Sequence, residues 1–589
     1  MADVLFVTNT HKKIIKAEVN GTMLLATKLL QAGFDTDILR FCQMDSFDQK
    51  AYLPFIREIT GRILEIHPKT VSFYALWSDY HVVLRIAKEV KAVAPDIITV
   101  LGGPQATSTP EQTLAFADYV DYICTGEGEN TVVPFFTALL KNGDLSSVPS
   151  VFYRRDGQIV HNHLDAPLCD LNDLPHWDDQ LYMADYTDTE KDLSSPSYFM
   201  PIDAGRGCPF RCTFCSTSSI WQHTYRLKSP QKIMDDILYY NQKFGMRSFW
   251  FTHDSFAANK KLVNAVCDEI LARGLDIKWK CTTRIDCISK ELILKMKQTG
   301  LAAIELGIET GSPRMQKLIN KRLNLQKAED MISFLLAQDL KVSLFFMYGF
   351  PEETEEDLNQ TLELLFNSVD KGVNYASLNF CNFNPGTVIT NQYMDQLVLD
   401  PKIKILKRAI FGYEEELDVI RANRDVFPFF YHLDTPLRNE FQHLAALGYI
   451  YLRFSKVIHH LRKLYHGDNL RFYRDFVSKN QQIFSLDMDE LVEALKRDPH
   501  TALCNTMADF NQPYLPLLKE LMRFECDKKR ISELKEDVIT QKCYGFSFLD
   551  FKRNLPIEQY CSGETEIMFQ KIGPETRVRL VDIRMSDKE

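Results

Sequence analysis

Three cysteines stand in one short stretch of the chain, Cys208, Cys212 and Cys215. Sulfur atoms at this spacing can converge on one compact centre only if the backbone between them closes into a loop. A disulfide would leave one sulfur over, and the 14 cysteines in 589 residues are too few for a disulfide framework. The trio is therefore interpreted first as a metal site.

The rest of the composition limits the compartment and the partners. Residues 1–7 have no basic stretch ahead of their apolar run, and no window of about 18 uncharged apolar residues occurs. We therefore expect a cytoplasmic protein without a membrane span, whose cysteines stay reduced. A net charge of −10, from 69 Lys+Arg and 79 Asp+Glu, disfavours binding to nucleic acid.

Two kinds of metal centre compete for the trio. Zinc normally takes a fourth cysteine or histidine, and His223 is the nearest imidazole downstream. An iron–sulfur cluster of the [4Fe–4S] type usually takes four thiolates, so three of them leave one iron open to another ligand. The spacing favours the cluster with an open iron, and zinc stays as the alternative.

The first part of the chain alternates short apolar runs with helix-like stretches. Strands are predicted at residues 4–8, 34–39, 71–76, 97–101 and 119–124. Helical periodicity lies between them, as at 22–31 and 82–93. This order predicts an α/β domain over residues 1–145. Its sheet should be doubly wound and mostly parallel, with a ligand site beyond the carboxyl ends of the strands.

Three further regions follow. Residues 146–195, rich in proline and aspartate, are expected to be a linker with one short hairpin. Strand candidates at 248–252, 278–282, 303–307, 341–347 and 375–383 predict a partial (β/α)6 barrel over residues 196–400. Residues 401–589 read as a mainly helical C-terminal domain that caps the barrel and defines the substrate, although 564–583 alternate like a strand.

The cysteine loop resembles that of the radical S-adenosylmethionine (SAM) enzymes, in which an aromatic residue, here Phe214, precedes the last cysteine. Segments similar to others of that family follow in its order, at 251–256 (Phe-Thr-His-Asp-Ser-Phe), 306–312, 348–354 and 384–387. The resemblance spans residues 196–390. It implies that the trio holds a [4Fe–4S] cluster, that SAM binds the open iron, and that the reduced cluster cleaves SAM to a 5′-deoxyadenosyl radical.

The same resemblance implies SAM contacts near the strand exits. The candidates are Phe214, Asp254, Ser255, Arg284 and Glu309. Three of them have structural alternatives: Asp254 as a helix N-cap, Glu309 as a solvated acid and Arg284 as one half of a surface ion pair.

Two glycine-rich turns follow successive strands of the first domain, at 102–105 (Gly-Gly-Pro-Gln) and 126–129 (Gly-Glu-Gly-Glu). Glycines there let a bulky ligand approach the backbone. Neither the G-x-G-x-x-G fingerprint nor a Walker loop is present, so nucleotide binding is disfavoured. Ahead of a radical SAM core, this pair of turns resembles the cobalamin-binding domain of cobalamin-dependent radical SAM enzymes.

That second resemblance implies cobalamin contacts along the carboxyl edge of the first sheet. The candidates are Ser72, Leu76, Trp77, Ser78, Gly102, Gly103, Gln105, Gly126, Glu127 and Gly128. Trp77 is a candidate to cover the lower face of cobalt, with core packing as the alternative. The D-x-H-x-x-G element of many cobalamin mutases is missing, and His11 and His81 are expected to be structural or exposed rather than cobalt ligands.

The combined resemblance implies a cobalamin-dependent radical SAM C-methyltransferase. The deoxyadenosyl radical would abstract a hydrogen atom from a natural product or peptide, and methylcobalamin would methylate the resulting unactivated carbon. A small-molecule or peptide substrate and an electron donor such as flavodoxin or ferredoxin are the expected partners. Tyr225 and His223 are weak candidates for a base.

Two other functions stay open. A rearrangement or cyclisation would use the same cofactors without methyl transfer, and a non-catalytic cobalamin or iron–sulfur sensor would use the same scaffold. A tRNA methylthiotransferase is disfavoured, because it would bring a second cysteine trio in its N-terminal domain, whereas Cys42, Cys124 and Cys169 lie far apart in the sequence.

Overall fold

The computed structural model of the chain divides into two compact units. The described residues are 2–10, 20–42, 49–162, 168–183, 198–222, 224–399, 414–451, 455–486, 491, 494–495, 497–506, 538–544, 564–572 and 575–581. One unit comprises Met1–Glu353 and Asn379–Glu440, and the other comprises Thr354–Leu378 and Phe441–Glu589. The chain therefore passes between the two units three times.

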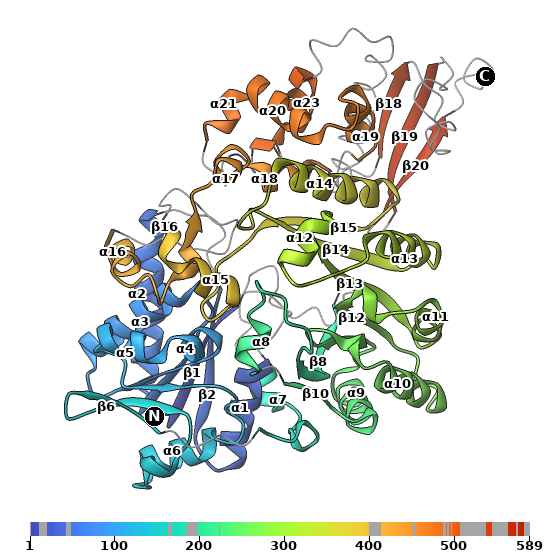
Figure 1. Ribbon diagram of the computed structural model, residues 1–589. Helices are drawn as coiled ribbons and strands as arrows, with labels where there is room; N and C mark the ends of the chain where they lie inside the picture. The colour runs from blue at the N-terminus through green and yellow to red at the C-terminus, as the bar shows by residue number, and fades with distance from the viewer. Residues whose placement is uncertain are drawn as a thin grey trace. The chain divides into compact units, whose positions relative to one another are not determined.

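A seven-stranded sheet opens the first unit, in the order β2-β1-β3-β4-β5-β6-β7 (Figure 1). Its strands are β1 (Val4–Thr10), β2 (Thr36–Cys42), β3 (Thr70–Tyr74), β4 (Ile98–Gly102), β5 (Tyr122–Cys124), β6 (Val151–Arg155) and β7 (Gln158–His161). β1 to β5 are parallel, and β6 and β7 extend the sheet antiparallel. The strand order reverses between β1 and β3, which is where doubly wound sheets bind their ligands. The predicted α/β fold class is confirmed.

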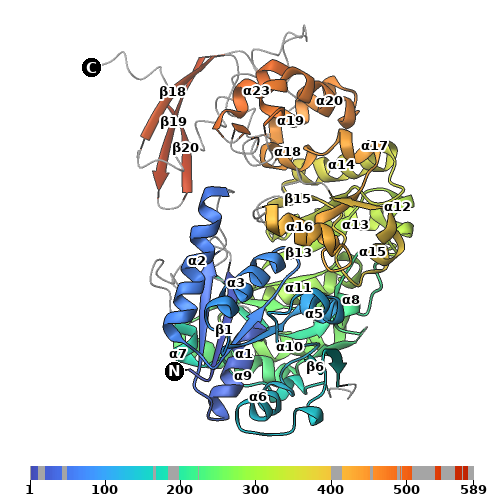
Figure 2. The same ribbon diagram turned by 90° about the vertical axis from the view of Figure 1, so that its left-hand side faces the viewer.

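Helices cover this sheet. They are α1 (Asn20–Gln31), α2 (Gln49–Ile66), α3 (Tyr80–Val93), α4 (Pro104–Ser108), α5 (Pro110–Phe116) and α6 (Val132–Leu140). α2 and α3 run side by side, as Figure 2 shows, and α1 packs with α6. In α3 the buried residues Val83, Ile86, Ala87 and Val90 recur at the spacing of one helical face, so this face joins the core of the sheet.

Short elements connect the sheet to the next domain. They are the 3-10 turn η2 (Leu171–Asp173) and helix α7 (Asp179–Met183), whereas the 3-10 turn η1 (Leu145–Ser147) joins α6 to β6 within the first domain. This connector is hydrogen-bonded to the domains on both sides of it. The Asp178 N–H donates to Thr27 Oγ1 of α1 in the first domain (2.9 Å), and the Trp177 N–H donates to the Tyr240 hydroxyl in the barrel (3.1 Å).

The second sheet is a partial barrel in the order β15-β14-β13-β12-β11-β8. Its strands are β8 (Met200–Asp203), β11 (Ser248–Thr252), β12 (Lys278–Arg284), β13 (Leu301–Glu309), β14 (Lys341–Tyr348) and β15 (Tyr375–Phe380). β8 and β11 to β14 pair in parallel. Burial alternates along β14, where Val342, Leu344 and Phe346 are fully buried. The predicted strand positions agree with this sheet.

Helices and turns separate the barrel strands. They are α9 (Pro230–Phe244), η3 (Phe256–Ala258), α10 (Lys260–Ala272), η4 (Ile285–Cys287), α11 (Lys290–Gln298), α12 (Pro313–Leu318), α13 (Leu325–Ala337) and α14 (Glu355–Asp370). Figure 1 shows α9, α10, α11 and α13 along the outer side of the strands. A short antiparallel pair, β9 (Gly205–Gly207) and β10 (Tyr225–Leu227), follows β8 and encloses α8 (Thr217–Ile220).

Residues 379–440 return to the first unit after β15. They contain α15 (Val388–Tyr393), η5 (Met394–Gln396), β16 (Leu397–Leu399), α16 (Glu414–Ala422), η6 (Pro428–Phe430), β17 (Tyr431–Leu433) and α17 (Pro436–Glu440). We call residues 414–433 the clasp, because they bind to the first domain. Arg85 of α3 pairs with Glu415 (2.6 Å) and Glu416 (3.1 Å) of α16.

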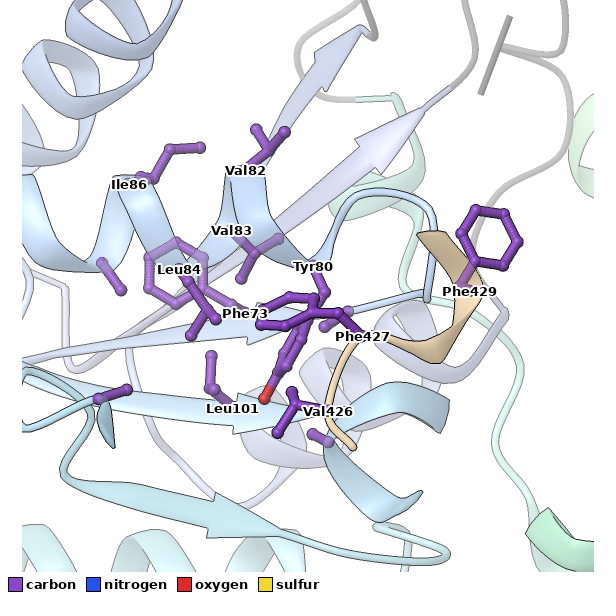
Figure 3. Packing of buried hydrophobic residues seen from close by; sticks show 14 of the residues in the cluster. Phe73, Tyr80, Val82, Val83, Leu84, Ile86, Leu101, Val426, Phe427 and Phe429 are labelled. Carbon is purple, nitrogen blue, oxygen red and sulfur yellow. The ribbon is translucent and has the colours of Figure 1, made fainter. Parts of the chain in front are cut away.

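The clasp also enters the core of the first domain. Figure 3 shows Val426 and Phe427 beside Tyr80 and Leu101, whereas Phe429 lies at the edge of the cluster. The Phe427 ring lies 5.8 Å from the Tyr80 ring. A segment more than 300 residues away in sequence thus completes the hydrophobic core of the first sheet.

The second unit is mainly helical. With α14 it contains α18 (Leu444–Tyr451), α19 (Ser455–Leu464), α20 (Asn469–Lys479), α21 (Gln481–Phe484) and α23 (Pro499–Thr506). α14 packs on α19 and α20, where Phe366 meets Tyr451 (4.3 Å between rings) and Asn359 accepts from Asn469 (3.1 Å). Its N-terminus has a reciprocal capping box between Thr354 and Asp357.

An antiparallel sheet ends the described chain, with β18 (Val538–Tyr544), β19 (Glu564–Ile572) and β20 (Glu575–Val581). The alternation predicted at 564–583 corresponds to β19 and β20. None of the helices in the described part of the chain has the length and apolar content that a bilayer crossing needs.

Candidate functional site

The cysteine loop emerges from the β9–β10 hairpin. Two glycines close this hairpin: a Cβ at Gly207, whose φ is +81°, would lie 2.1 Å from the Thr224 carbonyl oxygen, and one at Gly205 would lie 2.4 Å from that of Arg226. Only glycine fits at such distances. The Gly-Arg-Gly that precedes Cys208 therefore brings the two ends of the loop together.

Backbone hydrogen bonds hold the loop from outside. The Thr213 N–H donates to the Ile319 carbonyl (3.0 Å), and the Thr213 carbonyl accepts from the Ile389 N–H (3.0 Å). The Asn320 side chain donates to the Arg211 carbonyl (2.8 Å). Segments beyond β13 and β15 thus fix the conformation of the cysteine loop.

The three thiols suit an iron–sulfur cluster. All three are unpaired by disulfides and partly exposed, and the neighbouring Cys212 and Cys215 thiols contribute to raising the pKa of Cys208. Burial raises the pKa of all three, that of Cys208 to about 12. Deprotonated thiolates therefore require a positive partner, which iron provides. A donor set of three thiolates leaves one iron open.

Asp254 and Ser255 follow β11 beside the cysteine loop. Asp254 accepts a hydrogen bond from Thr217 Oγ1 of α8 (3.1 Å), and burial raises the pKa of its carboxyl. The next helical turns begin after Ser255 and Asn259, so Asp254 is not a helix cap. Ser255 is fully buried, and its N–H donates to His253 Nδ1 (2.8 Å).

Arg284 ends β12 next to the cysteines, with one guanidinium nitrogen 3.5 Å from Cys212 Sγ. Its other nitrogens form a two-pronged ion pair with Asp286 (2.8 and 3.0 Å) and donate to the Lys321 carbonyl (2.7 Å). The guanidinium is buried rather than part of a surface pair, and it is already engaged by a carboxylate of the chain itself.

Glu309 ends β13 in a strained backbone conformation, with φ at +69°. Its carboxylate accepts from Lys321 Nζ (2.8 Å), and both side chains fold over Gly307, where a Cβ would lie 2.4 Å from Glu309 Oε1. The pair is buried, so Glu309 is not a solvated acid. Sequence reasoning missed Lys321, which lies outside the motifs and becomes visible only through this contact.

The remaining candidates of the barrel differ in position. The Phe214 ring packs 5.9 Å from the Phe350 ring. The Tyr225 hydroxyl donates to the Ser255 carbonyl (3.4 Å) and accepts from the Asn259 N–H (3.1 Å), and burial raises its pKa to about 12, so it is a poor base near neutral pH. His223 lies outside the described residues.

Most cobalamin candidates gather at the carboxyl edge of the first sheet. Ser72 lies on β3, and Leu76, Trp77 and Ser78 form the loop after it. Trp77 packs against the core, and its buried indole N–H has no hydrogen-bond partner among the described residues. The loop is fixed by Asp79, whose carboxylate accepts from the Leu76 N–H (3.1 Å).

The glycines of the two turns bring these loops close to other parts of the chain. A Cβ at Gly103, with φ at +93°, would lie 3.0 Å from the Ala75 carbonyl oxygen, and one at Gly128 would lie 3.0 Å from Leu25. Gly102 meets only the Cys124 carbonyl at 3.9 Å, and the Gly126 N–H donates to Thr107 Oγ1 (3.0 Å). Gly103 and Gly128 thus make a compact edge between the strand exits.

Two polar candidates of these turns are engaged by protein groups. Gln105 is buried, and its amide donates to Thr109 Oγ1 and to the Val426 carbonyl of the clasp (2.9 Å each). The Glu127 carboxylate is 5% exposed and pairs with Arg226 and Arg206. Sequence reasoning missed both arginines, because nothing in the local pattern indicates a partner about 80 to 100 residues away.

His81 is buried at the start of α3, with its ring 5.1 Å from that of Phe430 in the clasp. His11 lies outside the described residues. Burial lowers the pKa of His81 to about 3. The imidazole is therefore neutral at physiological pH and is part of the core between α3 and the clasp.

This burial predicts a pH dependence. At a pH below 6.5, the ordinary pKa of histidine, the imidazole of the unfolded chain binds a proton, whereas the imidazole of the folded chain stays neutral. The contribution of neutral His81 to the free energy of unfolding is therefore complete above pH 6.5 and is lost as the pH falls. At pH 5 the loss is about 2 kcal/mol. We expect the thermal unfolding midpoint to decrease when the pH is lowered from 7 to 5, and to decrease less in His81→Leu. An equal fall in both proteins would contradict this assignment.

A segment of each of the two domains matches a known protein family. Residues 202–365 match the Radical SAM superfamily, and residues 16–135 match the B12 binding domain. An uncharacterized methyltransferase of Pyrococcus horikoshii is 27% identical over 360 residues, 59% of this chain and 76% of that protein. The anaerobic magnesium-protoporphyrin IX monomethyl ester cyclase of Rubrivivax gelatinosus is 27% identical over 345 residues, and the match spans 60% of its length.

A solved structure extends the likeness to most of the chain. It is that of the cobalamin-dependent S-adenosylmethionine radical enzyme OxsB with aqua-cobalamin and S-adenosylmethionine bound. The TM-score is 0.56 at 15% identity, and the alignment covers 91% of this chain and 82% of OxsB. At this identity the likeness shows a shared fold.

Proposed function

Because this chain is a cobalamin-dependent radical SAM enzyme, with a [4Fe–4S] cluster, SAM and cobalamin as its cofactors, we propose that it is a C-methyltransferase. Its substrate would be a natural product or peptide with an unactivated carbon. One observation carries the proposal: the turn after β5, at the carboxyl edge of the first sheet, is joined by ion pairs of Glu127 and Glu129 to the hairpin that carries the cysteine loop. A carbon bound between the two sites would have access to both cofactors.

When bound, the cluster and SAM supply a hydrogen-abstracting radical, and cobalamin supplies a methyl group. The residues of the chain hold and orient these groups. We assign Cys208, Cys212 and Cys215 to the cluster, and Asp254, Ser255 and Glu309 to the surroundings of SAM. Arg284 would orient Cys212 through its 3.5 Å contact while Asp286 holds the guanidinium. Phe214, which lies in the cysteine loop itself and packs against Phe350, stays a candidate contact of SAM.

For cobalamin, we assign the loops after β3, β4 and β5. Trp77 would cover the lower face of cobalt, since it lies in the loop after β3 at the reversal of strand order. His81 is held in the core by Phe430. His81 is therefore not assigned as a ligand of cobalt.

The Trp77 assignment predicts a spectroscopic change. In Trp77→Ala the lower face would be open to water, so we expect the absorption spectrum of bound cobalamin to shift while iron content stays that of the wild type. Trp250→Ala is the matched control, since it removes a partly buried tryptophan of the barrel. An unchanged cobalamin spectrum in Trp77→Ala would return this residue to a packing role.

Cofactor loading and labelled SAM together test the function. Protein purified without oxygen and reconstituted with iron, sulfide and hydroxocobalamin should contain about four irons per chain and stoichiometric cobalt. Incorporation of methyl label from SAM into candidate substrates would support methyl transfer. Iron without cobalt would refute the proposal.

The second candidate is a cyclisation or rearrangement without methyl transfer. The observation that favours it is the relative from Rubrivivax gelatinosus, which is named a cyclase and is as similar, at 27%, as the relative named a methyltransferase. A product that forms without methyl label would identify this reaction. Failure of the reduced, loaded protein to cleave SAM would instead indicate a sensor.

The substrate and the reductant also belong to the proposal. We propose a small-molecule or peptide substrate and a one-electron donor of the flavodoxin or ferredoxin kind, because the cluster has to be reduced. We also propose a cytoplasmic location, because the number and spacing of the cysteines suit a compartment in which thiols stay reduced.

A further inference from the structure

A buried group of charges joins three parts of the first unit. Its members come from the loop after β5, from the connector, and from the β8–β9 and β10 segments. We call this group the hub, and it consists of Glu127, Glu129, Cys169, Asp203, Arg206 and Arg226.

Arg206 is the centre of the hub. Its guanidinium lies 2.6 Å from Glu129 Oε1, 3.2 Å from Asp203 Oδ2 and 3.4 Å from Glu127 Oε1. The side chain of Arg206 is 8% exposed, and those of Glu127 and Glu129 are 5% exposed. Three carboxylates from two domains therefore share one buried cation.

Arg226 adds the second cation. It pairs with Glu127 and donates to the Cys169 carbonyl (2.9 Å), while the Cys169 N–H donates to Glu127 (3.3 Å). The ligand atoms of Glu127, Glu129 and Cys169 lie within 4.8 Å of one another, as they would around a metal ion. The two guanidiniums supply the positive charge there, so the hub is an ion-pair network rather than a metal site.

The hub stands between the two cofactor sites. Arg206 and Arg226 are cross-strand partners in the β9–β10 hairpin, and the chain runs from Arg206 through Gly207 directly into Cys208. On the other side, Glu127 and Glu129 follow β5 in one of the turns proposed above to hold cobalamin. A short path of paired charges thus connects the turn after β5 with the start of the cysteine loop.

We propose that the hub fixes the distance between the cobalamin site and the cluster site, with Arg206 and Arg226 as positioning residues. Separating its charges would leave them buried and unpaired, which is strongly unfavourable, so the two loops should move as one body. Such precision matters, because a misplacement of about 1 Å can lower a rate about 100-fold. The proposal needs both cofactors but does not depend on the reaction that they perform.

The experiment measures the geometry directly. Full-length protein is loaded with cob(II)alamin and a reduced cluster, and pulsed electron paramagnetic resonance records the dipolar coupling between the two unpaired spins. The wild type should give one narrow distribution of couplings. In Arg206→Gln and Arg226→Gln we expect a broadened or displaced distribution, with iron and cobalt content unchanged. Arg206→Lys, which keeps the charge, should restore part of the narrow signal.

The control is an ion pair of similar burial nearby. Lys228 lies two residues beyond Arg226, and its ammonium group pairs with Asp236 of α9 (2.8 Å), an element of the barrel. Lys228→Met should keep the narrow distribution even if it lowers thermal stability. If Arg206→Gln does not bind one of the cofactors, Glu129→Gln is measured in its place, because it removes one charge of the hub while the side chain keeps nearly the same shape. A narrow, unshifted signal in the hub variants, or equal broadening in Lys228→Met, would overturn the proposal.

Discussion

Cys212→Ala should abolish both cluster assembly and SAM cleavage while cobalamin stays bound. Cys212 is the middle thiol of the trio, and the loop offers no other cysteine between Cys208 and Cys215. Two thiolates would leave the cluster with one ligand fewer than the open-iron arrangement requires. Cobalamin should remain because its site lies in another domain. Iron and cobalt analysis and 5′-deoxyadenosine formation measure the two effects separately.

A second cysteine supplies the control for this experiment. Cys267 is fully buried on α10, away from the loop segment in sequence, so Cys267→Ala removes a sulfur of the core alone. We expect normal iron content and normal SAM cleavage from it. A complete cluster in Cys212→Ala would show that the trio is not the ligand set.

Phe427→Ala should destabilise the first domain strongly. Phe427 is 1% exposed and contacts Tyr80, Phe116 and Phe430. Loss of a buried phenylalanine leaves a cavity and typically costs about 3–5 kcal/mol. We expect a lower thermal unfolding midpoint of the apo protein, together with weaker cobalamin binding, since the clasp packs on the helix that follows the Trp77 loop.

The comparison variant is Tyr375→Ala, in which the aromatic side chain is 47% exposed. It should change the midpoint little, because its removal leaves no cavity. If Phe427→Ala matched this control, the clasp would not contribute to the core of the first domain.

Much of the fold followed from short-range patterns. The strands β11, β12 and β14 were predicted within a few residues, because their alternating apolar residues and the turns around them are local signals. The cysteine loop was recognisable for the same reason, since three thiols within eight residues need no knowledge of the tertiary structure. Helix α2 was missed, and Pro54 and Gly61 interrupt its helical pattern.

The partners of buried polar side chains could not be predicted from the sequence where they lie far away along the chain. Glu127 was predicted to contact cobalamin because it stands in a glycine-rich turn, and this prediction did not include the pairing of its carboxylate with Arg206 and Arg226. Gln105 was a cobalamin candidate for the same reason, and its amide binds the clasp. A single sequence shows which residues are polar, but the partner that satisfies a buried polar group depends on how distant segments come together.

Helix α14 has a consequence for how such proteins can diversify. In chain order it belongs among the barrel elements, yet it is grouped with the C-terminal helices and buries Leu358, Leu362 and Leu365. A recombination event that replaced everything after residue 440 would leave the old helix to pack against new neighbours. The C-terminal region therefore cannot be exchanged as a simple appended module, and inheritance of a new one should require matching changes in the sequence of α14.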